Sequence, residues 1–429
     1  MILVKNGQII NPATQISLKA DMLIEEGIIK AIGTDVYEDT NEKGEMQIID
    51  AEGMIVIPGL VDVHVHFRDP GFTHKEDIIT GAKAAAKGGF TTVVLMANTK
   101  PPVDNTENLQ SILEKGKKTG IHVESCANVT VGMAGHDLVD MAELAAAGAV
   151  GFSDDGMPLT DERIVRQAMQ QSLLLRKPLS FHEEDPTLIH NNGINAGIAS
   201  SAFGIAGSPR EAEITMIKRD IGLAHETGAV ISIQHISTAE GVELVRAARA
   251  AGYNIHAEAT PHHFTLTEDA VLRLGTLAKM NPPLRTESDR MAIIKGLQDG
   301  TIDIIATDHA PHTQAEKEQA ITDAPSGIIG LETALSLGIR ELVQKGYLTI
   351  MELIERMSTA PAQLYHLPAG DISPGQKADV VIFSPDKIHR VGKFASKSNN
   401  SPFIGEDLPG VVYMTICDGE IVYHNTADF

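Results

Sequence analysis

Histidines stand at the end of an apolar run near residue 60, where they have the spacing of a metal site. His64 and His66 lie two residues apart in VDVHVHF, so on a strand both imidazoles point to the same face. Such a pair can bind one ion, although a single imidazole is more often packed or exposed than ligating. The pair raises the hypothesis of a metal-dependent enzyme without deciding it.

Four more residues of ligand type close other apolar runs: Asp155 in GFSDDG, His182 after PLSF, His235 after ISIQ and Asp308 in IIATDHAPH. Four histidines and two aspartates are too few for two closed tetrahedral sites. They suffice for two open sites if a carboxylate and a hydroxide bridge the ions. We therefore expect two Zn²⁺ per chain, bridged by Asp155 and a hydroxide; Mn²⁺ or Co²⁺ would suit the same donors. The expected ligands are His64, His66 and Asp308 for one ion and His182 and His235 for the other.

The elements that must position these residues alternate along the chain. Eight candidate strands cover residues 56–64, 91–96, 123–127, 150–153, 179–182, 230–235, 255–259 and 302–307. Ala-rich helical stretches fall between them, at 78–87, 163–175, 212–225 and 239–250 among others. This alternation predicts an α/β protein with a (β/α)8 TIM-type barrel, whose active site lies at the C-terminal ends of the strands.

Both ends of the chain are typical of β structure. Asn6-Gly7 and Asp418-Gly419 lie between apolar runs and predict hairpin turns, because both central positions must accept positive φ. We expect a small composite β-sandwich domain from residues 1–52 and 368–429, with the barrel over residues 53–367.

Composition limits the function classes. The 429 residues are 43% hydrophobic and 21% charged, which excludes a mainly disordered chain. Lys and Arg number 35 against 57 Asp and Glu, and the formal charge of -22 argues against a nucleic-acid or anionic-membrane surface. An anionic substrate would need a locally positive pocket. Cys126 and Cys417 have no CxxC spacing, and no segment is of a type that targets or spans a membrane, so we expect a cytoplasmic enzyme.

Several longer motifs carry a family resemblance. They are PGLVDVHVHFRDPG, GGFTTVVLMANTKP, FSDDG, SFHEED, QHIST, AEATPHHF, KMNPPLR, ATDHAPH and GLETALSL, spread over nearly the whole chain. With these motifs the sequence resembles the class I bacterial dihydroorotases of the amidohydrolase superfamily. The resemblance implies a barrel with a terminal β-sandwich. It also implies reversible, zinc-dependent cyclisation of N-carbamoyl-L-aspartate to dihydroorotate and water, the third step of de novo UMP biosynthesis.

The resemblance also implies roles for single residues. It assigns zinc binding to the six ligands above, with Asp308 acting in addition as the catalytic acid and base. It assigns substrate binding to His66, Arg68, Asn98, Asn281, His312 and the backbone of Ser326 and Gly327. Arg68 offers a planar fork for a carboxylate. The chain departs from the family pattern at Ala97, where Pro is usual, and at Ser326, where Phe is usual, and neither change removes a functional side chain.

Some alternatives stay open at this level. Asp154 competes with Asp155 for the bridge, but neighbouring strand residues point apart, so only one should reach the metals. We expect His262 and His263 to be structural. For Asp69, His74 and Lys75, support of the site or packing of its loop is as consistent with the sequence as catalysis.

The main rival function is another cyclic amidohydrolase of the allantoinase or hydantoinase type, because the metal ligands indicate hydrolysis but do not identify the ring that is hydrolysed. A second rival is a noncatalytic dihydroorotase-like subunit that supports aspartate transcarbamoylase, but such chains typically lose zinc ligands. The expected partners are a small-molecule substrate, a second copy in a homodimer and, for an active chain as well, aspartate transcarbamoylase.

Overall fold

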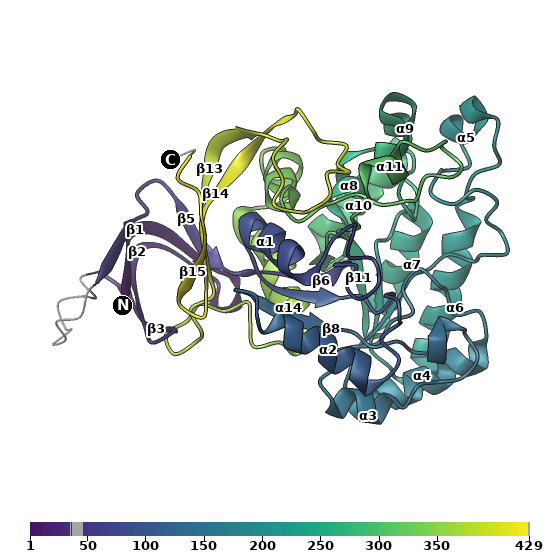
Figure 1. Cartoon of the computed structure of the whole chain (residues 1–429), viewed down its shortest axis with the longest axis horizontal. Helices are drawn as coiled ribbons and strands as arrows, with labels where there is room; N and C mark the ends of the chain where they lie inside the picture. The colour runs from purple at the N-terminus through teal and green to yellow at the C-terminus, as the bar shows by residue number, and fades with distance from the viewer. Residues whose placement is uncertain (35, 37–45, 428–429) are drawn as a thin grey trace.

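The chain forms a helix-covered barrel beside a β sheet that contains both termini. The computed structural model describes residues 1–34, 36 and 46–427 (Figure 1). The sheet, purple and yellow, lies on one side of the molecule, and the barrel occupies the other. Residues 35, 37–45 and 428–429 of the predicted terminal domain lie outside the described residues.

The barrel is closed by hydrogen bonds between parallel strands. Its strands are β6 (Leu60–Val65), β7 (Phe90–Leu95), β8 (His122–Ser125), β9 (Leu179–Phe181), β10 (Ile231–Ile233), β11 (Ile255–Ala259) and β12 (Ile304–Ile305). The first three strands form one sheet and the last four another. Phe152 bridges Ala127 on one side and Leu179 on the other, and Val65 bridges His309. With the predicted strand at 150–153 reduced to Phe152, eight positions complete the ring, as the (β/α)8 prediction requires.

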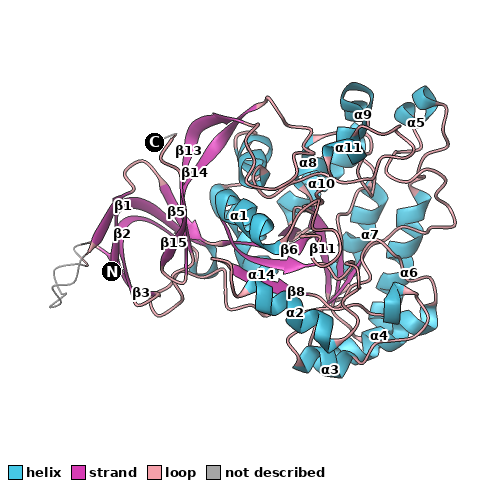
Figure 2. Ribbon diagram, in the orientation of Figure 1, coloured by secondary structure: helices cyan, strands magenta, loops and turns pink. Residues whose placement is uncertain are grey.

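Helices surround these strands (Figure 2). The helices are α1 (Ile78–Gly88), α2 (Thr106–Gly116), α3 (Met141–Ala146), α4 (Glu162–Leu175), α5 (Ile198–Phe203), α6 (Glu211–Thr227), α7 (Ala239–Ala250), α8 (Pro261–Thr265), α9 (Asp269–Leu274), α10 (Glu287–Asp299), α11 (Gln314–Lys317), α12 (Ala334–Gly338), α13 (Ile350–Ile354) and α14 (Ala360–Leu364). The first begins at Asp77, which caps Thr80 reciprocally, and ends at Gly89 with a φ of 89°. None of the described helices is long and apolar enough to cross a bilayer.

The terminal sheet is continuous. Its order is β15-β14-β13-β5-β1-β2-β3, with β4 paired to β1. The strands are β1 (Ile2–Asn11), β2 (Ile16–Glu25), β3 (Ile28–Gly33), β4 (Gln47–Asp50), β5 (Ile55–Pro58), β13 (Val380–Arg390), β14 (Asp407–Cys417) and β15 (Glu420–His424). Met22 and Ile29 share one buried cluster with Met414 and Ile416. The sheet therefore curls so that its two ends enclose a common apolar core, which gives the sandwich character.

The strand predicted over residues 56–64 is in fact two strands. β5 pairs with β1 and β13 in the terminal sheet, whereas β6 pairs with β7 in the barrel. Pro58 and Gly59 separate them, and a Cβ on Gly59 would lie 2.0 Å from Thr91 Oγ1, so the close approach to β7 requires glycine. Residues 55–58 thus lie with the terminal sheet, and the domain division predicted at residue 52 stays a prediction.

One predicted hairpin turn is wrong and the other is present. Asn6 and Gly7 lie inside β1, at a bulge, and β1 turns into β2 through Pro12–Thr14. Asn6 does have positive φ, at 63°, but its N–H donates to the Asp21 carboxylate within the paired strands. Asp418 and Gly419, with φ of 48° and 79°, do form the two-residue turn between β14 and β15.

An ion pair joins the barrel to the terminal sheet. His122, at the start of β8, places Nε2 3.0 Å from Oδ2 of Asp379, the residue before β13. Burial alone would lower the pKa of His122, but the Asp379 carboxylate outweighs it and raises that pKa. The protonated imidazole therefore strengthens this junction.

Candidate active site

The six predicted ligands meet at the C-terminal end of the barrel strands. All six are buried, and each follows or ends a strand position of the ring. Asp155 lies at the centre, with carboxylate oxygens 3.5 Å from His64 Nε2, 3.4 Å from His66 Nε2 and 3.6 Å from His182 Nδ1. His235 Nε2 lies 3.9 Å from the same carboxylate, and Asp308 Oδ1 lies 2.9 Å from His66 Nε2.

These spacings are those of a metal centre. Bonds of about 2.0–2.1 Å in tetrahedral geometry separate two donor atoms on one zinc ion by about 3.3–3.4 Å. At this centre two groups of three residues have ligand atoms within 4.8 Å of one another: His64, His66 and Asp308, and His64, Asp155 and His235. His64 Nε2 is also a buried nitrogen without a hydrogen-bond partner among the described residues. The donor set thus fits divalent ions.

Further side chains fix the orientation of the histidines. Glu258 Oε2 lies 3.0 Å from His64 Nδ1, and Asn98 Oδ1 lies 3.0 Å from His66 Nδ1, so each ring can donate there and turn Nε2 toward the centre. Glu184 Oε2 lies 3.0 Å from His182 Nε2, which leaves Nδ1 to face Asp155. This arrangement is typical of ligating imidazoles.

The backbone around the site is held in an uncommon conformation. Arg68, His235 and Asp308 all have positive φ, at 58°, 31° and 47°. For residues with a Cβ such φ values cost free energy, and they concentrate where surrounding structure over-determines them, often at functional sites.

The histidines of the centre keep its two aspartates ionised. Burial raises the pKa of Asp308, but His64 and His66 outweigh it and lower that pKa to about 2. Burial likewise opposes ionisation of Asp155, and His64 overrides it, so its pKa lies well below the usual range. Both aspartates are therefore carboxylates, the form that binds a metal and accepts a proton.

A cavity of about 350 Å³ opens over the centre. Every residue predicted to bind substrate lines it: His66, Arg68, Asn98, Asn281, His312, Ser326 and Gly327. Asn98 also donates to Asp155 Oδ2 at 2.9 Å and so links the substrate side to the ligands. Asn281 Nδ2 lies 3.2 Å from His182 Nε2.

His312 is held as a neutral donor and acceptor. Lys75 Nζ lies 3.3 Å from Nδ1, and Ser326 O lies 2.8 Å from Nε2, so Nδ1 accepts and Nε2 donates. Burial and the cations Arg68 and Lys75 lower the pKa of His312, which keeps the ring uncharged. Arg68 donates from Nε to Pro311 O at 3.3 Å, and in the described part of the chain no carboxylate lies within 4.0 Å of its guanidinium.

The competing assignments separate clearly. Asp154 turns away from the centre and accepts from Asn128 Nδ2 and the backbone of Val129 and Thr130. His263 is bonded to Thr260 and to Pro282 O, and neither it nor His262 lines the cavity. Of the three residues after HFR, Lys75 supports His312, Asp69 pairs with Lys115, and His74 is exposed.

Sequence reasoning missed several residues around the site. Glu258 and Glu184, which orient ligands, stood inside motifs that were read only for their histidines. Asn192 and Lys279 line the cavity but belong to no predicted role. A glutamate on a strand predicted to lie in the barrel was the available signal for Glu258, because a buried charge requires a partner.

Comparisons with known proteins agree with this geometry. Residues 53–241 match a family model described as Dihydro-orotase-like. A Clostridioides difficile protein named Dihydroorotase is 54% identical over 99% of this chain and 100% of its own length. A Clostridium acetobutylicum protein of the same name is 50% identical over 99% of this chain and 100% of its own. The chain belongs to the dihydroorotase family.

Solved structures extend the likeness to other members of the fold. The L-hydantoinase (dihydropyrimidinase) of Arthrobacter aurescens matches with a TM-score of 0.88 at 26% identity, covering 100% of this chain and 97% of that one. A D-hydantoinase from a Thermus species matches with a TM-score of 0.85 at 24% identity, covering 100% and 97%. The dihydroorotase family and the hydantoinases thus share the barrel and the terminal sheet.

The two departures from the dihydroorotase pattern are placed differently. Ala97 is buried, and its carbonyl accepts from the N–H groups of Thr99 and Val103, which closes the turn that contains Asn98. Ser326 lines the cavity, where its carbonyl accepts from His312.

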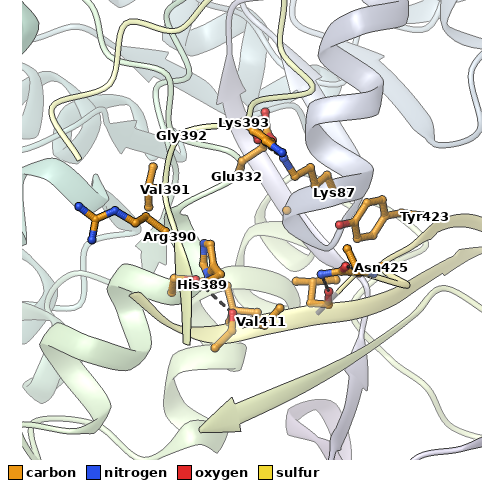
Figure 3. A pocket seen from close by; sticks show the side chains of 16 residues that line it. Lys87, Glu332, His389, Arg390, Val391, Gly392, Lys393, Val411, Tyr423 and Asn425 are labelled. Atoms are coloured by element: carbon orange, nitrogen blue, oxygen red, sulfur yellow. Dashed lines mark hydrogen bonds and ion pairs between the residues drawn. The ribbon is translucent and has the colours of Figure 1, made fainter. Parts of the chain in front are cut away.

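A larger cavity of about 660 Å³ lies away from this centre (Figure 3). It is lined by Lys87 of α1 and by residues of β13 and β14, between the barrel and the terminal sheet. Lys87 pairs there with Glu332 at 2.7 Å. None of the six ligands lines it, so volume alone does not locate the dihydroorotase chemistry.

Proposed function

We propose that this chain is a dihydroorotase that interconverts N-carbamoyl-L-aspartate and dihydroorotate at a two-zinc centre, the third step of de novo UMP biosynthesis. The observation that carries the substrate assignment is Arg68. It lies in the same cavity as the ligands, and among the described residues it has no carboxylate partner. A cation left unpaired in a cavity favours an anionic ligand, and a planar guanidinium suits a carboxylate.

The donor set suits Zn²⁺, because imidazoles and carboxylates without thiolate are typical of catalytic zinc. One ion would be held by His64, His66 and Asp308 and the other by His182 and His235, with Asp155 between them. Bound ions of this kind supply Lewis acidity toward a carbonyl and make water nucleophilic at neutral pH.

The protein's own residues do the rest. Arg68, Asn98 and the His312 imidazole bind and orient the substrate carboxylate, which places the ring amide over the ligands. Asp308 takes up a proton on its carboxylate during ring opening and returns it to the leaving ring nitrogen. In the reverse direction the same carboxylate moves the proton the other way, since both directions share one transition state.

The rival function is hydrolysis of an uncharged cyclic amide, which the likeness to hydantoinases keeps in view. We would assay the purified protein with dihydroorotate, allantoin and hydantoin side by side and measure its metal content. We expect turnover of dihydroorotate and close to two zinc ions per chain. Faster turnover of hydantoin than of dihydroorotate would refute the substrate assignment, and activity unaffected by complete metal removal would refute the metal centre.

The cellular setting is proposed as cytoplasmic, because both cysteines are buried free thiols. Homodimerisation and association with aspartate transcarbamoylase stay predictions.

A further inference from the structure

The 321–327 segment, which follows α11, forms one wall of the substrate cavity. Ala324, Pro325, Ser326 and Gly327 all line it. The segment has no regular helix or strand of its own, so side chains from elsewhere must hold its peptide planes.

Two lysines hold this segment by its carbonyl groups. Lys279 Nζ donates to Ile321 O at 2.8 Å and to Ala324 O at 2.7 Å. Lys317 Nζ donates to Pro325 O at 2.9 Å and to Gly327 O at 3.1 Å. Both lysines are only 4% exposed.

Neither ammonium group has a carboxylate within 4.0 Å among the described residues, so the carbonyls of this one segment replace both water and a counter-ion. Burial and the neighbouring Lys279 lower the pKa of Lys317 to about 7. Burying a cation without a carboxylate partner costs free energy. That cost indicates that Lys317 does more than hold a surface loop in place.

The contacts fix the two peptide planes on either side of Ser326. Pro325 O faces Lys317, and Ser326 O accepts from His312 Nε2 at 2.8 Å. In a trans peptide the C=O and N–H point in opposite directions. The Ser326 N–H therefore points away from Lys317. Ser326 lines the cavity and Lys317 does not. In the described chain this N–H makes no backbone hydrogen bond of its own.

We propose that Lys317, assisted by Lys279, is a positioning residue that aims the Ser326 amide N–H at an oxygen of the bound substrate. This proposal rests on the proposed function. Lys317 touches no substrate and acts through the segment. Lys279 holds the other half of the segment, and its backbone carbonyl accepts from Gly327 N–H at 3.0 Å.

The test compares Lys317→Met with the parent and with Lys118→Met, the same change at an exposed lysine. Methionine is unbranched, apolar and close to lysine in size, so it suits the buried position, and it removes the donors. We expect the KM for dihydroorotate to rise about 10-fold or more, the loss of one hydrogen bond to a charged substrate. kcat at saturation and zinc content should stay within about threefold and Lys118→Met should match the parent, because the ligands and Asp308 are untouched.

Hydrogen exchange gives a second readout. In Lys317→Met the amides of the 321–327 segment should exchange faster, while those of β6 and β11 keep the parent's protection. If Lys317→Met does not fold, Lys317→Gln, which removes the charge and shortens the side chain, is measured against the same expected rise in KM.

The outcomes distinguish this proposal from the proposed dihydroorotase function on which it rests. A zinc-loaded parent without dihydroorotase activity would overturn both. If the parent is active and Lys317→Met has the parent's KM, with or without a lower kcat, the positioning role alone is overturned.

Discussion

Arg68 offers the sharpest test of substrate recognition, because its guanidinium has no carboxylate partner among the described residues. We consider Arg68→Lys, which keeps the positive charge but loses the planar pair of donors. It also loses the bond from Nε to Pro311 O, which orients the group from behind. The ammonium of lysine is a point charge on a flexible stem and cannot make two parallel bonds to a carboxylate.

The expected size follows from the contact that is lost. A hydrogen bond to a charged group contributes about 1.5–3 kcal/mol, which corresponds to about 10- to 150-fold in kcat/KM. Because the carboxylate is held in both ground and transition states, most of the loss should appear in KM. The zinc ligands are unaffected, so metal content should equal that of the parent.

The assay measures ring opening of dihydroorotate and, in parallel, of dihydrouracil, the same ring without its carboxylate. Only kcat/KM for dihydroorotate should fall, so the ratio of the kcat/KM values for dihydroorotate and dihydrouracil should fall by about 10- to 150-fold. Arg163→Lys, at a side chain that is 82% exposed, is the matched control. Equal losses on both substrates, or none on dihydroorotate, would refute the assignment of Arg68 to the carboxylate.

Three further predictions concern chemistry, ligand support and the junction. Asp308→Asn should keep its metals yet lose about 10²- to 10⁴-fold in kcat for both ring opening and ring closure. If the metal-replete variant stays within a few-fold of the parent in either direction, Asp308 is a ligand only. Glu258→Gln should retain zinc about 10- to 100-fold less tightly in chelator competition, because His64 loses its charged partner; unchanged affinity would contradict that role. His122→Asn should lower Tm most below the ordinary histidine pKa of about 6.5, since a pKa raised by Asp379 contributes stability that is lost as pH rises through it. A Tm difference that is constant with pH would show that the ion pair does not stabilise the junction.

Much of the barrel could be predicted because its helices have strong local signals. The helix expected over residues 239–250 is α7 with the same bounds, since Thr238 caps it and one face is apolar. Strand partners have no such local signal. The run from Val56 to His64 is mostly apolar on both sides of Pro58 and Gly59, so its periodicity could not reveal that these two residues divide it between two sheets.

The hairpin signals show the same limit. Asn6-Gly7 and Asp418-Gly419 meet the same requirement for positive φ, yet only the second forms a turn. A left-handed residue also suits a bulge, and the choice is made by Asp21 on the neighbouring strand, which accepts from Asn6 N–H.

The site divides in a comparable way. Residues that end strands could be predicted to meet, because the ends of parallel strands collect at one face of a barrel. Lys317 could not be, because it belongs to a four-residue helix, and its role depends on the folded path of the segment that follows.

An acidic protein that binds an acid must solve a problem of local charge. The formal charge of -22 gives no long-range attraction for a carboxylate. Around the cavity, however, neither Lys279 nor Lys317 has a carboxylate within 4.0 Å among the described residues, and carbonyl groups accept their hydrogen bonds instead. Peptide carbonyls solvate a cation without cancelling its charge, so the field of each lysine persists at the cavity wall while that lysine is protonated, which for Lys317 means below a pH of about 7. Arg68 then supplies the direct contact and its geometry, while the wall behind Ser326 supplies part of the attraction. It follows that Lys317→Met should weaken binding of dihydroorotate more than binding of the uncharged dihydrouracil, and equal weakening of both would leave the lysine a purely geometric role.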